Sequence, residues 1–135
     1  MAVEGVGWTT VIAVLAPGQG SQAPGMLTSW LERDAAADRL GEYSAASGLD
    51  LARLGSTADA EEIKDTAIAQ PLIVATSLLA AEFAGASLPA DTPVAGHSVG
   101  ELAAAALAGV LRGVDAVALA ATRGTAMAAA CAQQP

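Results

Sequence analysis

The sequence predicts an α/β protein with a parallel sheet and helical crossovers, and two observations lead to this prediction. The short, continuously apolar segments Thr10–Leu15 and Thr92–Ala95 have the composition of buried strands, and each leads into a glycine-containing turn. The region between them is rich in alanine and has the apolar spacing of helices. Strands separated by helices usually pair in parallel, because the helical connection returns the chain to the same end of the sheet.

Breaker residues and apolar spacing predict the elements of the first half. They are a strand at Thr10–Leu15 that Pro17 ends, a loop at Gly18–Gly25, a helix at Met26–Glu32, a helix at Ala35–Ala46 that Gly48 ends, and a short polar helix at Asp59–Lys64.

The second half is expected to alternate helix, strand, helix, helix. Its elements are a helix at Leu72–Phe83 with Gln70-Pro71 in front of it and Gly85 after it, a strand at Thr92–Ala95, a helix from Glu101 to near Gly109, and a helix at Asp115–Ala130. Only two strands are recognisable, whereas a stable α/β sheet normally has more.

Size and charge narrow the classes of partner. The 135 residues are expected to form one domain or part of one, and their 53% hydrophobic content, much of it alanine, also suits a part of a larger core. The net charge is −8, and the six basic residues are scattered. Nucleic acid is therefore not an expected partner, because phosphate binding needs clustered lysine and arginine.

Cysteine content and hydropathy predict a cytoplasmic protein. Cys131 is the only cysteine, so an internal disulfide is excluded. The first eight residues lack the pattern of a signal peptide. The apolar run Leu102–Leu111 is about half the length that spans a bilayer, so no membrane segment is expected.

The pentapeptide Gly96–Gly100 (GHSVG) lies between an expected strand and an expected helix. A serine at such a turn takes a strained backbone conformation that exposes its hydroxyl, and N–H groups at the helix N-terminus can stabilise an oxyanion. Glycines two residues either side of Ser98 let the strand and the helix approach closely. The pattern favours a nucleophilic serine over a structural turn.

The loop after the first strand has two functional interpretations. Gly18–Ala23 formally fits the dinucleotide-binding fingerprint, with Asp38 or Glu42 near the acidic position, but Pro24 and Gly25 interrupt the helix that this fingerprint requires.

The second interpretation places the loop beside the serine turn, since both follow strands of a parallel sheet. The N–H groups of Gln19 and Val99 would then supply the two donors of an oxyanion hole. An ordinary turn is the alternative.

Four motifs cover almost the whole chain: Pro17–Gln22 (PGQGSQ), Gln70-Pro71, Gly96–Glu101 (GHSVGE) and Arg123-Gly124. Together they resemble the malonyl-CoA:acyl-carrier-protein transacylases of fatty-acid synthesis and the related acyltransferase domains of polyketide synthases. Arg123 follows Ser98 by 25 residues, as the substrate arginine of that family does. The resemblance implies that residues 1–135 form the N-terminal part of an α/β-hydrolase-like acyltransferase large subdomain.

The resemblance also implies a ping-pong reaction. Ser98 would be acylated by malonyl-CoA and pass the malonyl group to the phosphopantetheine thiol of acyl carrier protein. The N–H groups of Gln19 and Val99 would hold the oxyanion, and Arg123 would pair with the free malonate carboxylate. Arginine suits this role because its planar fork binds a carboxylate through two hydrogen bonds. No cofactor or metal is implied.

His97 and Gln70 receive secondary roles. His97 is the only histidine and adjoins Ser98, but neighbouring residues at such a turn point in different directions, so it is not expected to be the base. The resemblance implies a pocket-lining or hydrogen-bonding role for His97. Gln70 is expected to line the substrate pocket, or to serve only as a helix-start residue.

The family's catalytic histidine and its small ferredoxin-like subdomain would lie beyond residue 135. Because a serine without a base is a poor nucleophile, the chain alone is expected to be nearly inactive, with the rest of the same enzyme as a partner. A truncation, a split gene and a piece of a longer polypeptide all stay open. So do two other functions: a serine hydrolase of the esterase or lipase type, and a non-catalytic fragment.

Overall fold

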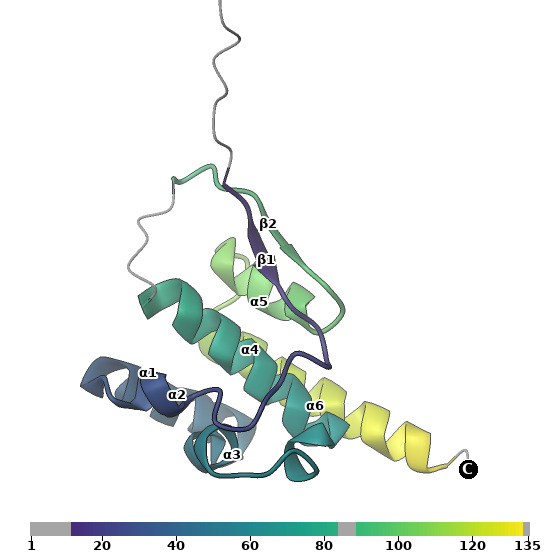
Figure 1. The fold of residues 1–135 in the computed structure, drawn as a ribbon. Coiled ribbons are helices and arrows are strands. Elements are labelled where there is room, and N and C mark those ends of the chain that lie inside the picture. The colour runs from purple at the N-terminus through teal and green to yellow at the C-terminus, as the bar shows by residue number, and fades with distance from the viewer. Residues whose placement is uncertain (1–11, 84–88, 134–135) are drawn as a thin grey trace, which may run out of the picture.

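A computed structural model describes residues 12–83 and 89–133 (Figure 1). In chain order it contains β1 (Val14–Ala16), α1 (Thr28–Leu31), α2 (Asp34–Ser47), α3 (Leu51–Ser56), the 3₁₀ turn η1 (Glu62–Lys64), α4 (Thr66–Phe83), β2 (Val94–Gly96), α5 (Gly100–Leu107) and α6 (Gly113–Ala132). The expectations for Thr10, Val11 and Gly85 fall outside the described residues.

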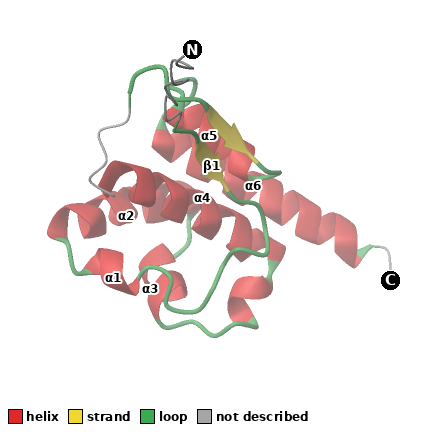
Figure 2. Cartoon of the chain, turned by 45° about the horizontal axis from the view of Figure 1, so that its top comes forward, coloured by secondary structure: helices red, strands yellow, loops and turns green. Residues whose placement is uncertain are grey.

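The two strands form a parallel pair, with Val14 opposite Val94 and Ala16 opposite Gly96. The helices α1 to α4 make the crossover between them, and α5 packs on both strands (Figure 2). The predicted α/β class with a parallel sheet is therefore confirmed. Each strand ends one residue later than expected, at Ala16 and Gly96.

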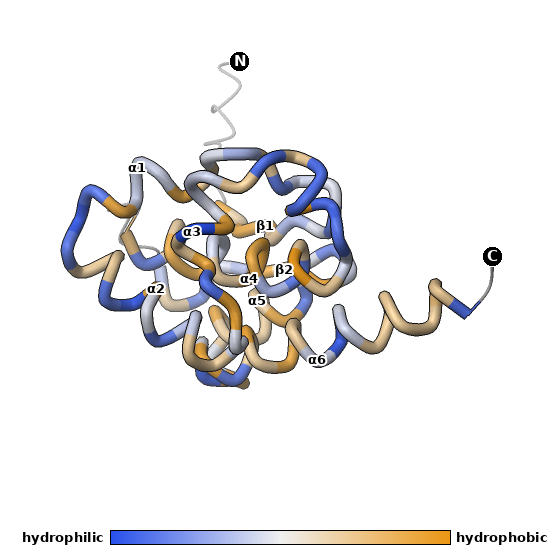
Figure 3. The backbone as a smooth tube through the Cα atoms, turned by 90° about the horizontal axis from the view of Figure 1, so that it is seen from below, coloured by the Kyte–Doolittle hydropathy of each residue, from blue (hydrophilic) through white to orange (hydrophobic). Residues whose placement is uncertain are grey.

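The central element is α4, which runs beside α6 and also contacts α2, α3 and α5 (Figure 1). Leu72, Val74 and Leu79 of this helix are fully buried. Figure 3 shows hydrophobic stretches of β1, α4 and α5 inside the molecule and hydrophilic stretches along its rim. Since α4 is covered on several sides, it is apolar almost all round rather than along one stripe.

The start of α4 differs from the expectation. The helix begins at Thr66, where the Asp65 Oδ1 accepts the Ala67 N–H at 2.8 Å and so satisfies a free donor of the first turn. Pro71 therefore lies inside the helix and not in its first turn. A proline there removes the hydrogen bond to the Ala67 carbonyl. The helix continues because the whole stretch from Gln70 to Ala75 is buried.

Several helix ends follow the predicted glycine signals. Gly48 ends α2 with a φ of 71°, and Gly109 follows α5 with a φ of 78°. The expected helix at Asp115–Ala130 is α6, which is slightly longer at both ends. The helix expected at Met26–Glu32 is shorter, and only α1 is helical.

The segment between α2 and α4 was predicted incorrectly. The expected helix at Asp59–Lys64 is only the single turn η1, and the unexpected helix α3 precedes it. The Asp50 side chain caps α3 by accepting the Arg53 N–H at 3.0 Å, and the helix buries Leu51 and Leu54. Six residues are too few to show a helical period in the sequence, so tertiary burial decides this element.

One helix of the described structure, α4, passes a length and composition test for crossing a bilayer, with a mean hydropathy of 1.4 over its 18 residues. This apolar stretch is longer than the run Leu102–Leu111, on which the expectation of no membrane segment was based. Half of α4 is buried inside the fold, and core helices pass the same test. The packing of α4 thus accounts for its apolar character.

The contact between α4 and α6 predicts a large cost for a small substitution. A Cβ at Gly124 of α6 would lie 2.6 Å from the Thr66 carbonyl oxygen, so Gly124→Ala should lower the free energy of unfolding by about 2 kcal/mol. Gly41→Ala in α2 is the matched control, because nothing lies within 4 Å of its Cβ, and it should raise stability by up to about 1 kcal/mol. Urea unfolding would measure both, and equal effects would contradict the described helix contact.

Candidate active site around Ser98

Ser98 occupies the turn between β2 and α5. Its φ is 56°, the left-handed region, and it is the one non-glycine residue with a positive φ in the described ranges. A left-handed serine is strained by about 1–2 kcal/mol. The strained turn leaves the Ser98 side chain exposed while its neighbour Val99 is fully buried. The expected elbow geometry is therefore present.

Two glycines make this turn sterically feasible. A Cβ on Gly96 would collide with the backbone of Gly100, and a Cβ on Gly100 would collide with the carbonyl oxygen of Ala16. The strand β2, the start of α5 and the end of β1 thus meet with no room for side chains. This contact holds the Ser98 turn against the end of β1.

The loop after β1 lies directly beside the elbow. A Cβ on Gly18 would be 2.5 Å from the Nδ1 of His97, and the His97 N–H donates to the Ala16 carbonyl at 3.0 Å. Within residues 12–83 and 89–133, the N–H groups of Gln19 and Val99 donate no hydrogen bond. Both N–H groups are therefore unengaged on neighbouring segments, as the second interpretation of the loop expected.

Arg123, in α6, contacts the serine. Its Nη2 donates to the Ser98 Oγ at 3.2 Å, and its Nη1 donates to the Gln70 Oε1 at 2.7 Å. Five ion pairs occur among the described residues, and none of them involves Arg123. The guanidinium beside Ser98 is thus held by neutral groups, and its charge has no protein carboxylate to balance it in the described structure.

Gln70 connects α4 to this arginine. Its side chain is 1% exposed, and its Nε2 donates to the Met127 Sδ at 3.3 Å while its Oε1 accepts from Arg123. Gln70 is the one buried polar residue of the described core. It is therefore more than a helix-start residue, because both ends of its amide face α6.

His97 does not contact Ser98 through its ring. The imidazole Nδ1 lies against Gly18, on the side of the loop, and no hydrogen bond to Ser98 Oγ is found for it among the described residues. This agrees with the expectation that neighbouring residues at the elbow point in different directions.

Thr66 and Met127 belong to the site but were not singled out from the sequence. The Thr66 Oγ1 accepts a hydrogen bond from the Gln19 Nε2 at 3.1 Å, 47 residues earlier in the chain. Thr66 precedes Gln70 by four residues, so both lie on one face of α4. That spacing is a usable sequence signal once the helix is known to begin at Thr66.

The structure does not support the dinucleotide interpretation. The fingerprint requires a helix that opens within the glycine motif, so that its N-terminus meets the phosphates. Here α1 begins only at Thr28 and has four residues. The side chain of Glu42 lies elsewhere, in an ion pair with Arg39 at 2.7 Å.

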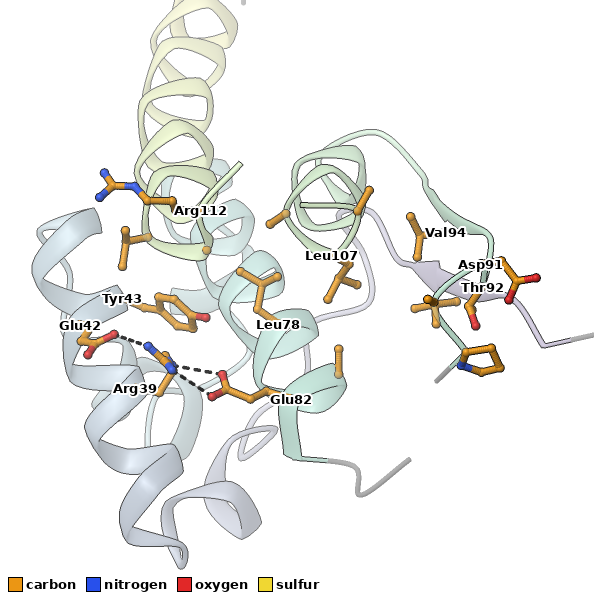
Figure 4. A pocket seen from close by; sticks show the side chains of 18 residues that line it. Arg39, Glu42, Tyr43, Leu78, Glu82, Asp91, Thr92, Val94, Leu107 and Arg112 are labelled. Atoms are coloured by element: carbon orange, nitrogen blue, oxygen red, sulfur yellow. Dashed lines mark hydrogen bonds and ion pairs between the residues drawn. The ribbon is translucent and has the colours of Figure 1, made fainter. Parts of the chain in front are cut away.

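A hollow lies at the end of the strands opposite to Ser98. It has a volume of about 940 Å³ and is lined by parts of α2, α4, α5 and β2 (Figure 4). Arg39 pairs with Glu42 and with Glu82 at its edge, and hydrogen bonds to these partners raise the pKa of Arg39. Burial raises the pKa of the neighbouring Tyr43. Arg39, Glu42 and Glu82 of this hollow are thus already engaged with one another.

A strand, a left-handed serine and a helix follow one another here, and this is the geometry of the strand-turn-helix elbow found in α/β proteins. Over residues 14–134 the chain matches the family described as acyl transferase domain. The chain belongs to this family.

Individual proteins that are similar to this chain carry names that fit this family. The chain is 62% identical over 128 residues to a malonyl CoA-acyl carrier protein transacylase of Mycobacterium tuberculosis (strain ATCC 25618 / H37Rv), covering 93% of this chain and 42% of that protein. The crystal structure of MCAT from Mycobacterium tuberculosis matches with a TM-score of 0.84 at 59% identity, covering 93% of this chain and 43% of that one. The chain thus spans about two-fifths of the length of these relatives.

A further solved structure holds a type II PKS acyl-carrier protein in complex with its malonyl-transacylase. It matches with a TM-score of 0.72 at 32% identity, covering 86% of this chain and 38% of that one. The shared fold therefore extends to proteins of clearly lower identity.

The strain at Ser98 gives a stability test. The free energy of unfolding of Ser98→Gly should be about 1 kcal/mol higher than that of Ser98→Ala, because glycine adopts a positive φ without a Cβ clash. Ser77, inside α4, is the control at which the order should reverse by about 1 kcal/mol in favour of alanine. Thermal unfolding of the four variants would compare them. An alanine variant at Ser98 as stable as the glycine variant would refute the strain.

Proposed function

We propose that this chain carries the acyl-accepting serine of a malonyl-CoA:acyl-carrier-protein transacylase. The observation that supports this most directly is the contact of Arg123 with Ser98 at 3.2 Å. A nucleophile alone would suit any acyl transfer, but a cation beside it selects an acyl group with a free carboxylate. The 62% identical relative, whose name states this activity, supports the same proposal.

The proposed reaction has two matched halves. In the first, the Ser98 Oγ bonds to the thioester carbonyl carbon of malonyl-CoA and gives its proton to a general base. The C–S bond then breaks, and the base passes this proton to the sulfur of the departing coenzyme A. In the second, the phosphopantetheine thiol of acyl carrier protein gives its proton to the base and attacks the ester carbonyl carbon, the C–O bond to Ser98 breaks, and the Ser98 Oγ takes a proton from the base. The N–H groups of Gln19 and Val99 would hold the negative oxygen in both halves.

Arg123 would bind the malonyl carboxylate. In the free site its Nη2 rests on the Ser98 Oγ, and an arriving carboxylate would take that place with two charge-assisted hydrogen bonds. Gln70, buried and bonded to Nη1 at 2.7 Å, would keep the guanidinium turned toward the serine. An acetyl group would leave the arginine without an anion, so it would bind less well.

The general base is proposed to come from outside these residues, since the ring of His97 lies against Gly18.

Exposed apolar surfaces support the further proposal that residues 1–135 are the N-terminal part of a large subdomain. Leu15 on the sheet is 76% exposed, and Met127 on the outer half of α6 is 40% exposed. Parallel sheets are normally covered on both faces, and the relatives have more than twice this length of chain.

The family match does not favour the esterase or lipase alternative. The cytoplasmic location stays a prediction from the sequence.

Intact-mass measurement tests the proposed function. The longest natural polypeptide that contains these residues should gain one malonyl group from malonyl-CoA, and much less from acetyl-CoA, while Ser98→Ala should gain none because the accepting oxygen is gone. Equal loading by both thioesters would indicate a general acyl acceptor, and loading that survives in Ser98→Ala would rule out the serine.

Arg123 gives a second test. Arg123→Ala should slow malonyl loading by about 30-fold or more, because the carboxylate loses a charged partner, and should leave acetyl loading unchanged. Arg123→Lys should recover only part of the rate, since an ammonium lacks the planar fork.

Arg112→Ala is the control for this series. Arg112 precedes the same helix but pairs with Asp115 at 2.6 Å on the surface, so its loss should not affect loading. The carboxylate role of Arg123 is refuted if its alanine variant loses acetyl and malonyl loading equally.

A further inference from the structure

We propose that Thr66 is a positioning residue that fixes the Gln19 loop for catalysis, and this inference rests on the proposed function. The hydroxyl of Thr66 would act through Gln19 and would not touch the substrate. Its place in the fold makes the first turn of α4 a common support for the loop on one side and for Arg123 on the other.

The loop itself is folded locally but has few ties to the rest of the protein. The Ser21 N–H and Oγ both bond to the Gly18 carbonyl, and the Gly20 N–H donates to the Gln22 Oε1 at 2.8 Å. Gly20 has a φ of 108°, which no other residue type adopts easily. These bonds give the loop its shape, but they do not fix its position relative to Ser98.

The bond from Gln19 to Thr66 supplies that missing tie. It spans 3.1 Å between the Gln19 Nε2 and the Thr66 Oγ1, and it is the side-chain hydrogen bond that links residues 18–22 to a helix in the described structure. On the other side, His97 closes against Gly18. The backbone of Gln19 is thus fixed between the elbow and α4, with its own side chain turned toward the helix.

Thr66 is a suitable anchor because its backbone is immobilised. The Asp65 side chain caps the turn through the Ala67 N–H, and the Thr66 carbonyl oxygen is in close contact with Gly124 of α6. Gly124 follows Arg123 directly in the chain. One turn of α4 therefore contacts the helix that carries the arginine through Thr66 and Gln70, and contacts the loop through the Thr66 hydroxyl.

This arrangement links the two recognition elements of the site. The oxyanion donor must lie within about 0.5 Å of its productive place relative to the nucleophile. Gln19 bonds to Thr66 and Arg123 bonds to Gln70, and both acceptors lie at the start of α4. The distance between Gln19 and Arg123 is therefore set by α4 and not by the exposed loop. Loss of the Thr66 hydroxyl should loosen the donor while the carboxylate site stays intact.

A substitution series on the longest natural polypeptide that contains these residues tests the inference. Thr66→Val keeps the shape and removes the acceptor, Thr66→Ser keeps the acceptor, and Gln19→Leu breaks the same bond from the loop side. Thr76→Val is the matched control, since Thr76 also lies in α4 but bonds to the Leu72 carbonyl at 2.8 Å. The measurement is the rate of Ser98 malonylation at several malonyl-CoA concentrations, together with the thermal unfolding midpoint.

The expected result is a selective loss of rate. Thr66→Val and Gln19→Leu should each lower kcat about 10-fold with KM changed less than about 2-fold, because the donor is displaced but the carboxylate site is kept. The double variant should be no slower than either single variant, since both break one bond. Thr66→Ser and Thr76→Val should keep the original rate.

Three outcomes would overturn the inference. In the first, Thr66→Val keeps the full rate while the unmodified polypeptide is malonylated, which leaves the proposed function standing and removes only the role of Thr66. Thr66→Ser could lose as much rate as Thr66→Val, which would point to packing in place of the hydrogen bond. An unmodified polypeptide that malonyl-CoA does not acylate on Ser98 would refute the proposed function and this inference together. If Thr66→Val does not fold, Gln19→Leu gives the same comparison from the exposed loop.

Discussion

The close contact of α4 with α6 is the interaction on which the site depends. Gly124 lets the two helices meet at the Thr66 carbonyl, and the residue before it, Arg123, is thereby brought to Gln70 and Ser98. A side chain at Gly124 would push α6 outward and withdraw the guanidinium. The position of the Arg123 guanidinium at the serine therefore depends directly on how closely α4 and α6 pack.

The elbow adds a second constraint of the same kind. Gly96, Gly100 and Ala16 meet backbone to backbone, and this contact holds Ser98 in a left-handed conformation that costs stability. The buried side chain of Val99 anchors the start of α5 beneath it. The close backbone contacts on both sides of Ser98 thus keep this residue in its strained left-handed conformation.

The features that depend on local sequence could be predicted without the structure. Gly48 marked the end of α2, and the GHSVG turn marked the elbow, because glycines at such positions have few other uses. The start of α4 was misread because Pro71 is a strong local signal for a first turn, and the burial of the surrounding helix overrides it. The short helix α3 was missed because its six residues are held by Asp50 and by core burial, and neither leaves a periodic pattern.

The residues alone were enough to predict the class of fold and a serine at the turn after the second strand, because turn glycines and apolar strands are local signals. The choice of Arg123 came from the resemblance to a family. How these residues meet depends on the packing of the whole fold. It brings Arg123 within 3.2 Å of Ser98, and it ties Gln19 to Thr66 across 47 residues of chain. Such contacts depend on where α4 begins and how closely α6 packs against it. Those two features follow from burial of the whole chain, and no local stretch of sequence contains them.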